Sequence, residues 1–267
     1  MASLHLQRYV EYSKALIKRR LAFKMNMVLL MSFQIMSPII MLFVWTAIYL
    51  ASGVSTISNF TLLQIATYFF VIAALNAMAP DISWGILGDV RSGNIFSILT
   101  RPLSYVWVIV SGAFANILFD TITVGIPILV LLVVFAHVSL TLSTAALFAL
   151  SVLVMLCLTI MTEFLIGYIA FFFIDIGGLL NISNFVMQFL GGGMIPLNLL
   201  PSGISAVTSV LPFQFMLYTP AAIFTGAVSN VQAEQSLILG VLWLGIFMVL
   251  CYGMWYAAKR HIDAVGV

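Results

Sequence analysis

Long apolar runs that are nearly free of charge decide what this chain can fold into. A helix needs about 20 mostly apolar residues to cross the hydrocarbon core of a bilayer, where the backbone must satisfy its own polar groups. Only 7% of the 267 residues are charged and 63% are hydrophobic, far from the composition of a soluble protein. The sequence therefore predicts an all-α polytopic membrane protein with a single transmembrane domain over residues 1–267. Six runs are predicted to span the membrane, at residues 27–50, 61–78, 106–135, 144–173, 179–194 and 237–256.

Two segments outside these runs also carry a structural signal. Residues 3–24 predict a basic amphipathic helix, with apolar side chains on one side and Arg and Lys on the other. Such a helix lies in the headgroup plane with its cations toward anionic lipid. Residues 195–235 are divided by four prolines into apolar pieces too short to cross. They predict short re-entrant helices before the last span, which a membrane tolerates where protein covers the open backbone.

The placement of basic residues predicts the orientation. With six spans, both termini, the 82–105 connection and the 174–178 turn lie on one side, and all ten Lys and Arg fall there. The positive-inside rule makes that side the cytoplasm, so the protein is expected in the cell (inner) membrane with the 195–235 helices outside. A seventh span at 202–228 would move Lys259 and Arg260 to the outside, which disfavours it.

The 82–105 connection, ISWGILGDVRSGNIFSILTRPLSY, is a charged island in the apolar chain and is expected to be a loop in water. Residues 89–99 predict a short helix whose apolar face contains Ile95, Ile98 and Leu99, ended by Pro102. A short helix of this kind is suited to a groove of another protein. A plain connecting loop with an interfacial helix is the alternative.

Polar groups inside the runs leave several functions open. Asp120 and Glu163 are carboxylates deep in apolar segments, where a proton relay, a cation site or a structural tie between the third and fourth spans would each explain them. The tie is favoured, because no second acid or His lies at helical spacing beside either. Five further polar side chains either line a substrate path or hold helices together, namely Gln34, Ser37, Asn76, Asn184 and Gln188.

Several chemistries have no signal in the sequence. There is no G-x-x-x-x-G-K-[ST] loop, so the chain is not expected to bind ATP by itself. No metal-binding pattern, cofactor motif or nucleic-acid partner is indicated. Cys157 and Cys251 both lie in apolar runs and are interpreted as small hydrophobic residues.

Three stretches resemble the permease subunits of the second class of ABC exporters, in particular a branch of short bacterial and archaeal permeases. Residues 88–105 match an acidic-x-Arg-x-Gly pattern followed by Leu-x-Arg-Pro-Leu. Residues 191–226 match a series of small residues, Pro-Leu, Leu-Pro-Phe and Tyr-x-Pro, and the ending KRHIDAVGV is similar to the basic tail of the family. Asn94 departs mildly, since the family often has Glu there.

The resemblance implies an arrangement of parts. Residues 3–24 would be the connecting helix, and the 82–105 loop would hold a coupling helix seated in a separate ABC ATPase subunit, which binds ATP and Mg. Two permeases, in a homodimer or heterodimer, would pair through the first and fifth spans, and the 195–235 helices would form an outer gate. Phe96 and Leu99 are expected as docking anchors, Arg91 as a charged contact and Asn94 as peripheral. The full set of expected coupling residues is Asp89, Arg91, Gly93, Phe96, Leu99 and Arg101.

Taken with the resemblance, the sequence predicts a permease rather than an enzyme. It would export a hydrophobic or amphipathic compound, such as a drug, lipid or peptide antibiotic, with ATP hydrolysed by the partner. The alternatives are a proton-coupled secondary carrier that uses Asp120 and Glu163, a glycan or lipid flippase of the same family, and a membrane-embedded assembly protein without transport.

Overall fold

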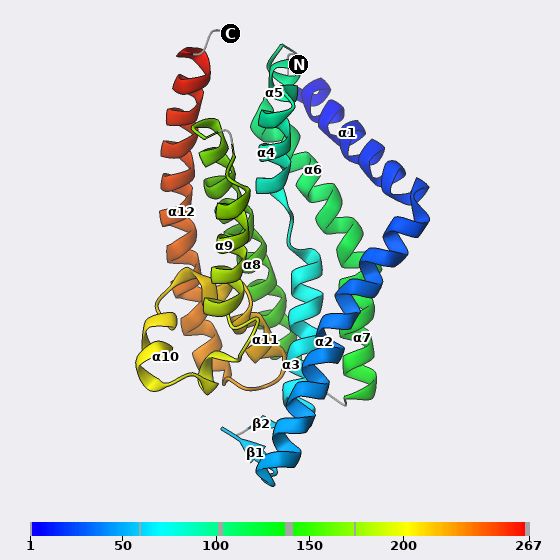
Figure 1. Cartoon of the computed structure of the whole chain (residues 1–267), viewed down its shortest axis with the longest axis vertical. Coiled ribbons are helices and arrows are strands. Elements are labelled where there is room, and N and C mark those ends of the chain that lie inside the picture. Colours follow the sequence, from blue (N-terminus) through cyan, green and yellow to red (C-terminus); the bar gives the residue numbers. More distant parts are fainter. Residues whose placement is uncertain (1, 59, 101–103, 137–140, 174, 265–267) are drawn as a thin grey trace.

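The computed structural model describes residues 2–58, 60–100, 104–136, 141–173 and 175–264. Within them the chain is a bundle of helices with one two-stranded hairpin, so the predicted all-α membrane fold is confirmed (Figure 1). The helices of the first half are α1 (Ala2–Ala22), α2 (Lys24–Ser52), α3 (Leu62–Met78), α4 (Ile82–Arg91), α5 (Asn94–Leu99), α6 (Tyr105–Asp120) and α7 (Ile126–Phe135). Those of the second half are α8 (Leu142–Tyr168), α9 (Gly177–Leu190), α10 (Ser202–Thr208), α11 (Tyr218–Phe224) and α12 (Asn230–Ala264).

Short elements join these helices. The hairpin consists of β1 (Thr56–Ile57) and β2 (Phe60–Thr61), antiparallel, with Ile57 opposite Phe60. A π-helical segment, η1 (Thr121–Gly125), links α6 to α7. Three 3₁₀ turns complete the described chain, η2 (Ile169–Phe171), η3 (Leu197–Leu199) and η4 (Pro212–Phe215).

Five helical stretches among the described residues are long and apolar enough to cross a membrane: Met31–Ser52, Leu62–Arg91, Tyr105–Phe135, Leu142–Phe171 and Asn230–Arg260. The predicted fifth span corresponds to α9, which has 14 residues. At 1.5 Å per residue it is about 21 Å long, shorter than a bilayer core of about 30 Å. It begins toward the end of the bundle that holds both termini and runs toward α10 and α11 (Figure 1). The six-span count therefore stays a prediction.

The connection after the second span is not wholly a loop in water, contrary to the prediction. After a break at Ala79–Asp81 the chain continues as α4, which packs against α8 and α9 and buries Ile82, Ile86 and Leu87. The break follows from Pro80, because the residue before a proline avoids the helical region. The prediction rested on the charged residues of the 82–105 stretch, which begin only at Asp89, after the apolar face of α4.

Helix α3 forms the centre of the bundle. In the stretch that contains it, 61% of the 18-residue apolar window is buried, against 11–28% of the corresponding windows in the other four long stretches. It contacts α2, α6, α7 and α11, and its residues Tyr68, Phe69 and Leu75 belong to a core shared with α8 and α12. The Tyr68 hydroxyl donates to the Gly192 carbonyl at 2.7 Å, which ties this centre to the turn after α9. The other long helices leave large apolar side chains exposed, as lipid or a partner subunit requires.

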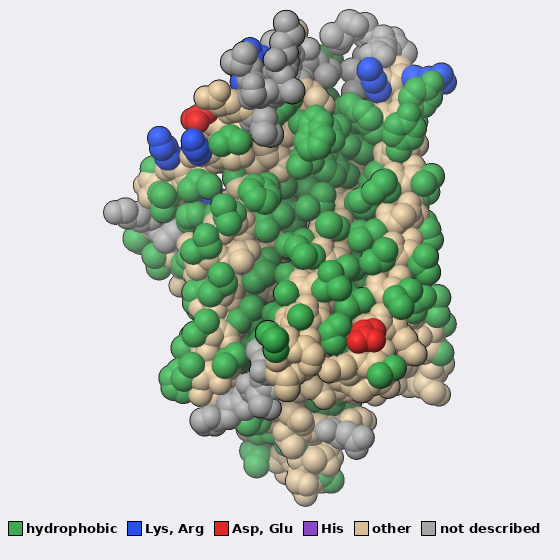
Figure 2. Space-filling model, turned by 180° about the vertical axis from the view of Figure 1, so that it is seen from behind, with side chains coloured by type: hydrophobic (Ala, Val, Ile, Leu, Met, Phe, Trp, Pro, Cys, Tyr) green, Lys and Arg blue, Asp and Glu red, His purple; other side chains and the backbone are tan. Residues whose placement is uncertain are grey.

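The basic residues gather at one end of the molecule, where both termini lie (Figures 1 and 2). Helix α1 lies obliquely along α6 and meets α2 at Phe23. Within the predicted re-entrant segment 195–235, short helices are present as α10 and α11, with η3 and η4. The last long helix begins at Asn230. The predicted re-entrant segment, which ends at residue 235, and the predicted start of the sixth span, at residue 237, are therefore both placed too late.

Candidate functional site

A cavity of about 800 Å³ lies among α1, α2, α3, α6, α8 and α9. Four of the five polar side chains that the sequence singled out line it together, namely Gln34, Asn76, Asn184 and Gln188. They come from α2, α3 and α9, so the fold brings distant amides to one wall. Ser37 is exposed on α2 and does not line the cavity.

Two of the cavity amides bind each other. The Gln188 Nε2 donates to Asn76 Oδ1 at 2.7 Å, and Asn76 Nδ2 points back to Gln188 Oε1 at 3.5 Å. This reciprocal pair joins the central helix α3 to α9. Of the two alternatives left open by the sequence, helix tying therefore applies at these two positions; both side chains also line the cavity, and its use as a substrate path stays a prediction.

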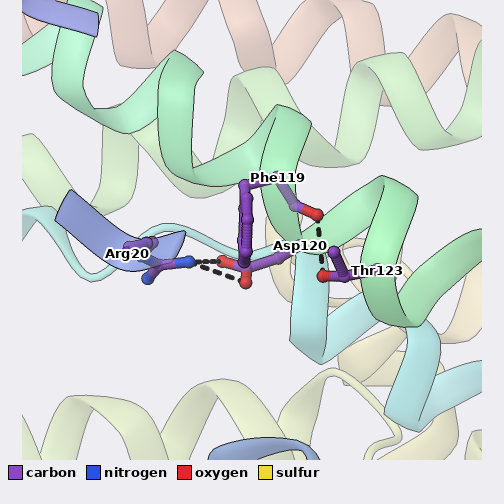
Figure 3. Close-up of polar contacts among 4 residues, drawn as sticks. All are labelled: Arg20, Phe119, Asp120 and Thr123. Carbon is purple, nitrogen blue, oxygen red and sulfur yellow. Dashed lines mark hydrogen bonds and ion pairs between the residues drawn. The ribbon is translucent and has the colours of Figure 1, made fainter. Parts of the chain in front are cut away.

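Asp120 lies on the cavity wall with a cation as its partner (Figure 3). The Nη1 of Arg20, near the end of α1, is 2.7 Å from each carboxylate oxygen of Asp120. The guanidinium also stands over the Phe119 ring, with its carbon 5.5 Å from the ring centroid, which adds a cation–π contact. The expected tie between the third and fourth spans is wrong for Asp120, because its partner belongs to the N-terminal helix.

The backbone beside Asp120 departs from the α-helix. The Ile126 N–H bonds the Thr121 carbonyl, five residues back, and the Thr123 hydroxyl donates to the Phe119 carbonyl at 2.8 Å (Figure 3). In a regular α-helix Pro127 would lie opposite the Thr123 carbonyl. It has no N–H to donate to that carbonyl and its ring would clash with it, so a widened turn avoids the clash. Such π-helical turns inside α-helices often occur at functional sites.

Glu163 holds the start of α4. Its Oε2 accepts the backbone N–H of Ser83 at 2.9 Å and the Ser83 hydroxyl at 2.6 Å. A carboxylate at a helix N-terminus satisfies an unpaired donor and complements the helix dipole. The expected tie is therefore wrong for Glu163 as well: α8 is joined to α4, which continues the second span.

Asp81 was not singled out by the sequence analysis, yet it lines the same cavity. It occupies the position before α4, where an Asp often caps a helix, but its side chain makes no such bond. An Asp after a proline and before an apolar helix was the signal that could have found it. Arg20 was also missed as a site residue, because it appeared only as one cation among several in a basic helix.

The segment predicted to dock on a partner consists of two helices rather than one. Gly93 has φ of +69°, a conformation that favours glycine, and separates α4 from α5. On α5 Ile95 is buried, whereas Phe96 is 43% exposed and free to meet another protein. Arg101 and the side chain of Leu99 lie outside the described residues.

Two polar contacts connect this segment to the rest of the chain. Arg91 forms an ion pair with Asp175 in the turn before α9. Asp175 lies outside the long helices, and the Gly177 N–H, followed by the Arg91 guanidinium, lowers the pKa of its carboxyl. The predicted contact of Arg91 with an ATPase stays a prediction, but the guanidinium already has a partner within this chain.

Asp89 links α5 to the start of α6. It accepts the Asn94 side-chain N–H at 2.7 Å and the Tyr105 hydroxyl at 3.2 Å. The Tyr105 ring in turn stacks on Trp255 of α12, with centroids 6.3 Å apart. Asn94 therefore joins the two short helices within this chain, and its peripheral position at an ATPase interface stays a prediction.

The comparison with protein families agrees with this architecture of apolar helices around a polar cavity. A sequence model described as ABC-2 family transporter protein matches residues 35–266, nearly the whole chain. No curated protein matches the chain. The match includes the described stretches of all the cavity helices from α3 to α9 and the segment around α5. The chain therefore belongs to the ABC-2 family of transporter proteins, as a multi-pass permease component.

Proposed function

We propose that this permease exports a hydrophobic or amphipathic compound across the cell membrane, driven by ATP that a separate ABC ATPase subunit binds with Mg and hydrolyses. The observation that carries the proposal is the connection between α5 and the cavity. Helix α5 presents an exposed Phe96, and α4 runs from α5 to Asp81 on the cavity wall. The whole distance along α4 is 10 residues, about 15 Å.

Helix α4 is suited to transmit a displacement of α5. Glu163 holds its first turn to α8, and Arg91 holds its last turn to the segment before α9. A helix of only 10 residues is short and held by its own backbone hydrogen bonds, so its two ends are proposed to move together. A docked ATPase that shifts α5 would therefore shift the wall of the cavity, and the permease would change its affinity by favouring one of two states.

Docking itself is proposed to depend on α5. Large apolar side chains in a desolvated pocket dominate interfaces of this kind, which makes Phe96 the leading anchor among the described side chains. Leu99 and Arg101 remain proposed contacts from the resemblance. Asp89 and Gly93 shape the segment, because one bonds both neighbouring helices and the other permits the turn between α4 and α5.

A second permease subunit is proposed to cover the exposed apolar faces of α2 and α9. Phe43 on α2 is 70% exposed, and Ile182 and Phe185 on α9 are 63% and 56% exposed. In a homodimer or heterodimer these faces would meet across the path, with α10 and α11 as an outer gate and α1 as the connecting helix.

We also propose six spans with both termini in the cytoplasm. Single cysteines at Ser55 and Ser229, introduced after Cys157 and Cys251 are replaced, should react with an impermeant maleimide added to intact cells. A cysteine at Ser92 should react only in opened cells. Labelling of Ser92 from outside would refute the orientation.

The proton-coupled carrier has less support. Asp120 is matched by Arg20, and Glu163 is bonded by Ser83, so neither is a free acid awaiting a proton. Neither carboxylate bonds the other, and a relay needs acids within reach of one another.

The deciding experiment is co-purification of this chain with the ATPase encoded beside it, followed by reconstitution into liposomes. ATP-dependent uptake of an amphipathic dye into inside-out vesicles is expected, together with dye-stimulated ATP hydrolysis. A catalytically dead ATPase is the matched control. Uptake driven by a pH gradient without ATP would support the carrier instead.

A further inference from the structure

Within the described part of the chain, one carboxylate of the cavity forms no ion pair and no side-chain hydrogen bond. Asp120 is matched by Arg20, and Glu163 by the Ser83 N–H and hydroxyl. The side chain of Asp81 lines the same cavity, and among the described residues it forms no ion pair, no helix-capping bond and no other hydrogen bond. The Asp81 side chain is exposed, and it lines the cavity without a counter-ion in contact, so a ligand cation that enters the cavity gains affinity from its charge.

The two cations of the cavity do not fill this role. Arg20 attracts Asp81 electrostatically, but both of its hydrogen bonds go to Asp120. The Asp120 carboxylate in turn repels Asp81. These three groups together carry one net negative charge. Arg19 is exposed at the end of the basic helix α1, where lipid phosphates supply its counter-ions. Lipid headgroups of the same sign cannot neutralise Asp81.

The remaining lining suits a bulky apolar body. Met31, Met155, Met187 and Met216 contribute flexible, polarisable side chains that adapt to irregular shapes. Phe23, whose side chain is 62% exposed, adds an aromatic face that attracts a cation as well as apolar surface. The amides can accept or donate hydrogen bonds but carry no charge.

We propose that the cavity binds organic cations with large apolar substituents, and that Asp81 is their counter-ion. Calling these cations the transported substrate rests on the proposed export function, whereas their binding to the cavity does not. Asp81 thereby becomes the residue that selects the charge of the ligand, while the Met and Phe side chains accept its bulk.

Binding of tetraphenylphosphonium to the purified chain in nanodiscs of phosphatidylcholine tests this proposal. Tetraphenylborate has nearly the same shape and the opposite charge. The unaltered protein should bind the phosphonium at least tenfold more tightly than the borate, after subtraction of binding to empty nanodiscs. Equal affinities, or tighter binding of the borate, would overturn the proposal without any variant.

Variants then locate the counter-ion. Asp81→Asn should weaken phosphonium binding about 10- to 100-fold, as expected for losing the attraction of two unit charges held apart by the phenyl groups at a low effective dielectric constant, and leave borate binding no weaker. Asp81→Glu keeps the charge and should retain most of the affinity. Glu234→Gln, which neutralises an exposed carboxylate on α12 away from the cavity, is the control and should change nothing. Unchanged phosphonium binding in Asp81→Asn would refute the role of Asp81.

The two proposals can fail separately. Phosphonium binding that depends on Asp81, without ATP-driven uptake, would refute the export function but not the cation site. ATP-driven uptake of a neutral amphipathic dye without phosphonium binding would do the reverse.

Discussion

The ion pair between Arg20 and Asp120 ties the end of α1 to α6, and breaking it should lower the free energy of unfolding by a measurable amount. The side chains are 37% and 23% exposed, so the pair is neither on the surface nor fully buried. Two unit charges about 4 Å apart attract by about 4 kcal/mol at an effective dielectric constant of about 20. Lost hydration cancels part of this gain, while fully exposed pairs yield at most about 1 kcal/mol. An interaction energy of about 2 kcal/mol is therefore expected, a factor of about 30.

A double-mutant cycle on reversible unfolding in mixed micelles measures this energy. The cycle compares Arg20→Ala, Asp120→Ala and the double variant with the unaltered chain, because only the non-additive part belongs to the pair. Lys14 and Glu11 form the matched control: their charged atoms are 2.8 Å apart on α1, but the side chains are 58% and 61% exposed, so solvent screening should leave almost no coupling. A coupling for Arg20 and Asp120 no larger than that of the control would refute the reasoning.

The same pair separates a structural role from a proton relay. Asp120→Asn keeps an oxygen that can accept from Arg20 while removing the titrating group. Substantial ATP-driven transport should remain in this variant, because the energy source is external in the proposed mechanism. Complete loss of transport in a protein that still assembles and stimulates hydrolysis would argue for the carrier.

Three further outcomes are expected. Glu163→Gln should retain transport because an amide oxygen can still accept from Ser83, whereas Glu163→Leu leaves a buried N–H and hydroxyl unpaired and should cost about 1–3 kcal/mol in unfolding measurements. Phe96→Ala should weaken pull-down of the ATPase by about 2 kcal/mol, roughly thirtyfold, with insertion unchanged; normal pull-down would mean that α5 is only a connector. Arg91→Glu should reduce substrate-stimulated hydrolysis, and adding Asp175→Arg should restore part of it, since the pair lies within this chain; no rescue would point to a contact with the ATPase instead.

Sequence patterns predicted what depends on local composition. The long apolar runs predict the helices, and the proline-divided segment predicts short pieces, because both are properties of neighbouring residues. The polar amides were identified one by one. Their meeting in one cavity was beyond the sequence, since Asn76 and Gln188 are separated by 112 positions and no local spacing encodes their contact.

The partners of the two membrane carboxylates show the same limit. Arg20 and Asp120 are 100 positions apart, and Ser83 and Glu163 are 80 apart. Helical spacing finds partners on one helix, so it found none for either acid. The break at Gly93 is different: glycine was visible in the sequence, but a helical periodicity over residues 89–99 concealed a positive φ that only the fold reveals.

The packing of α4 supports the proposed communication between α5 and the cavity. Gly167 of α8 has no side chain, and an added Cβ would lie 2.6 Å from Ile86 Cδ1 and 3.1 Å from the Ser83 Cα. The two helices therefore touch backbone to backbone at the residue that Glu163 holds. Such close contact leaves little room for α4 to bend between its ends. In the proposed mechanism, a push delivered at α5 would therefore displace the first turn of α4, and with it Asp81 in the wall of the cavity.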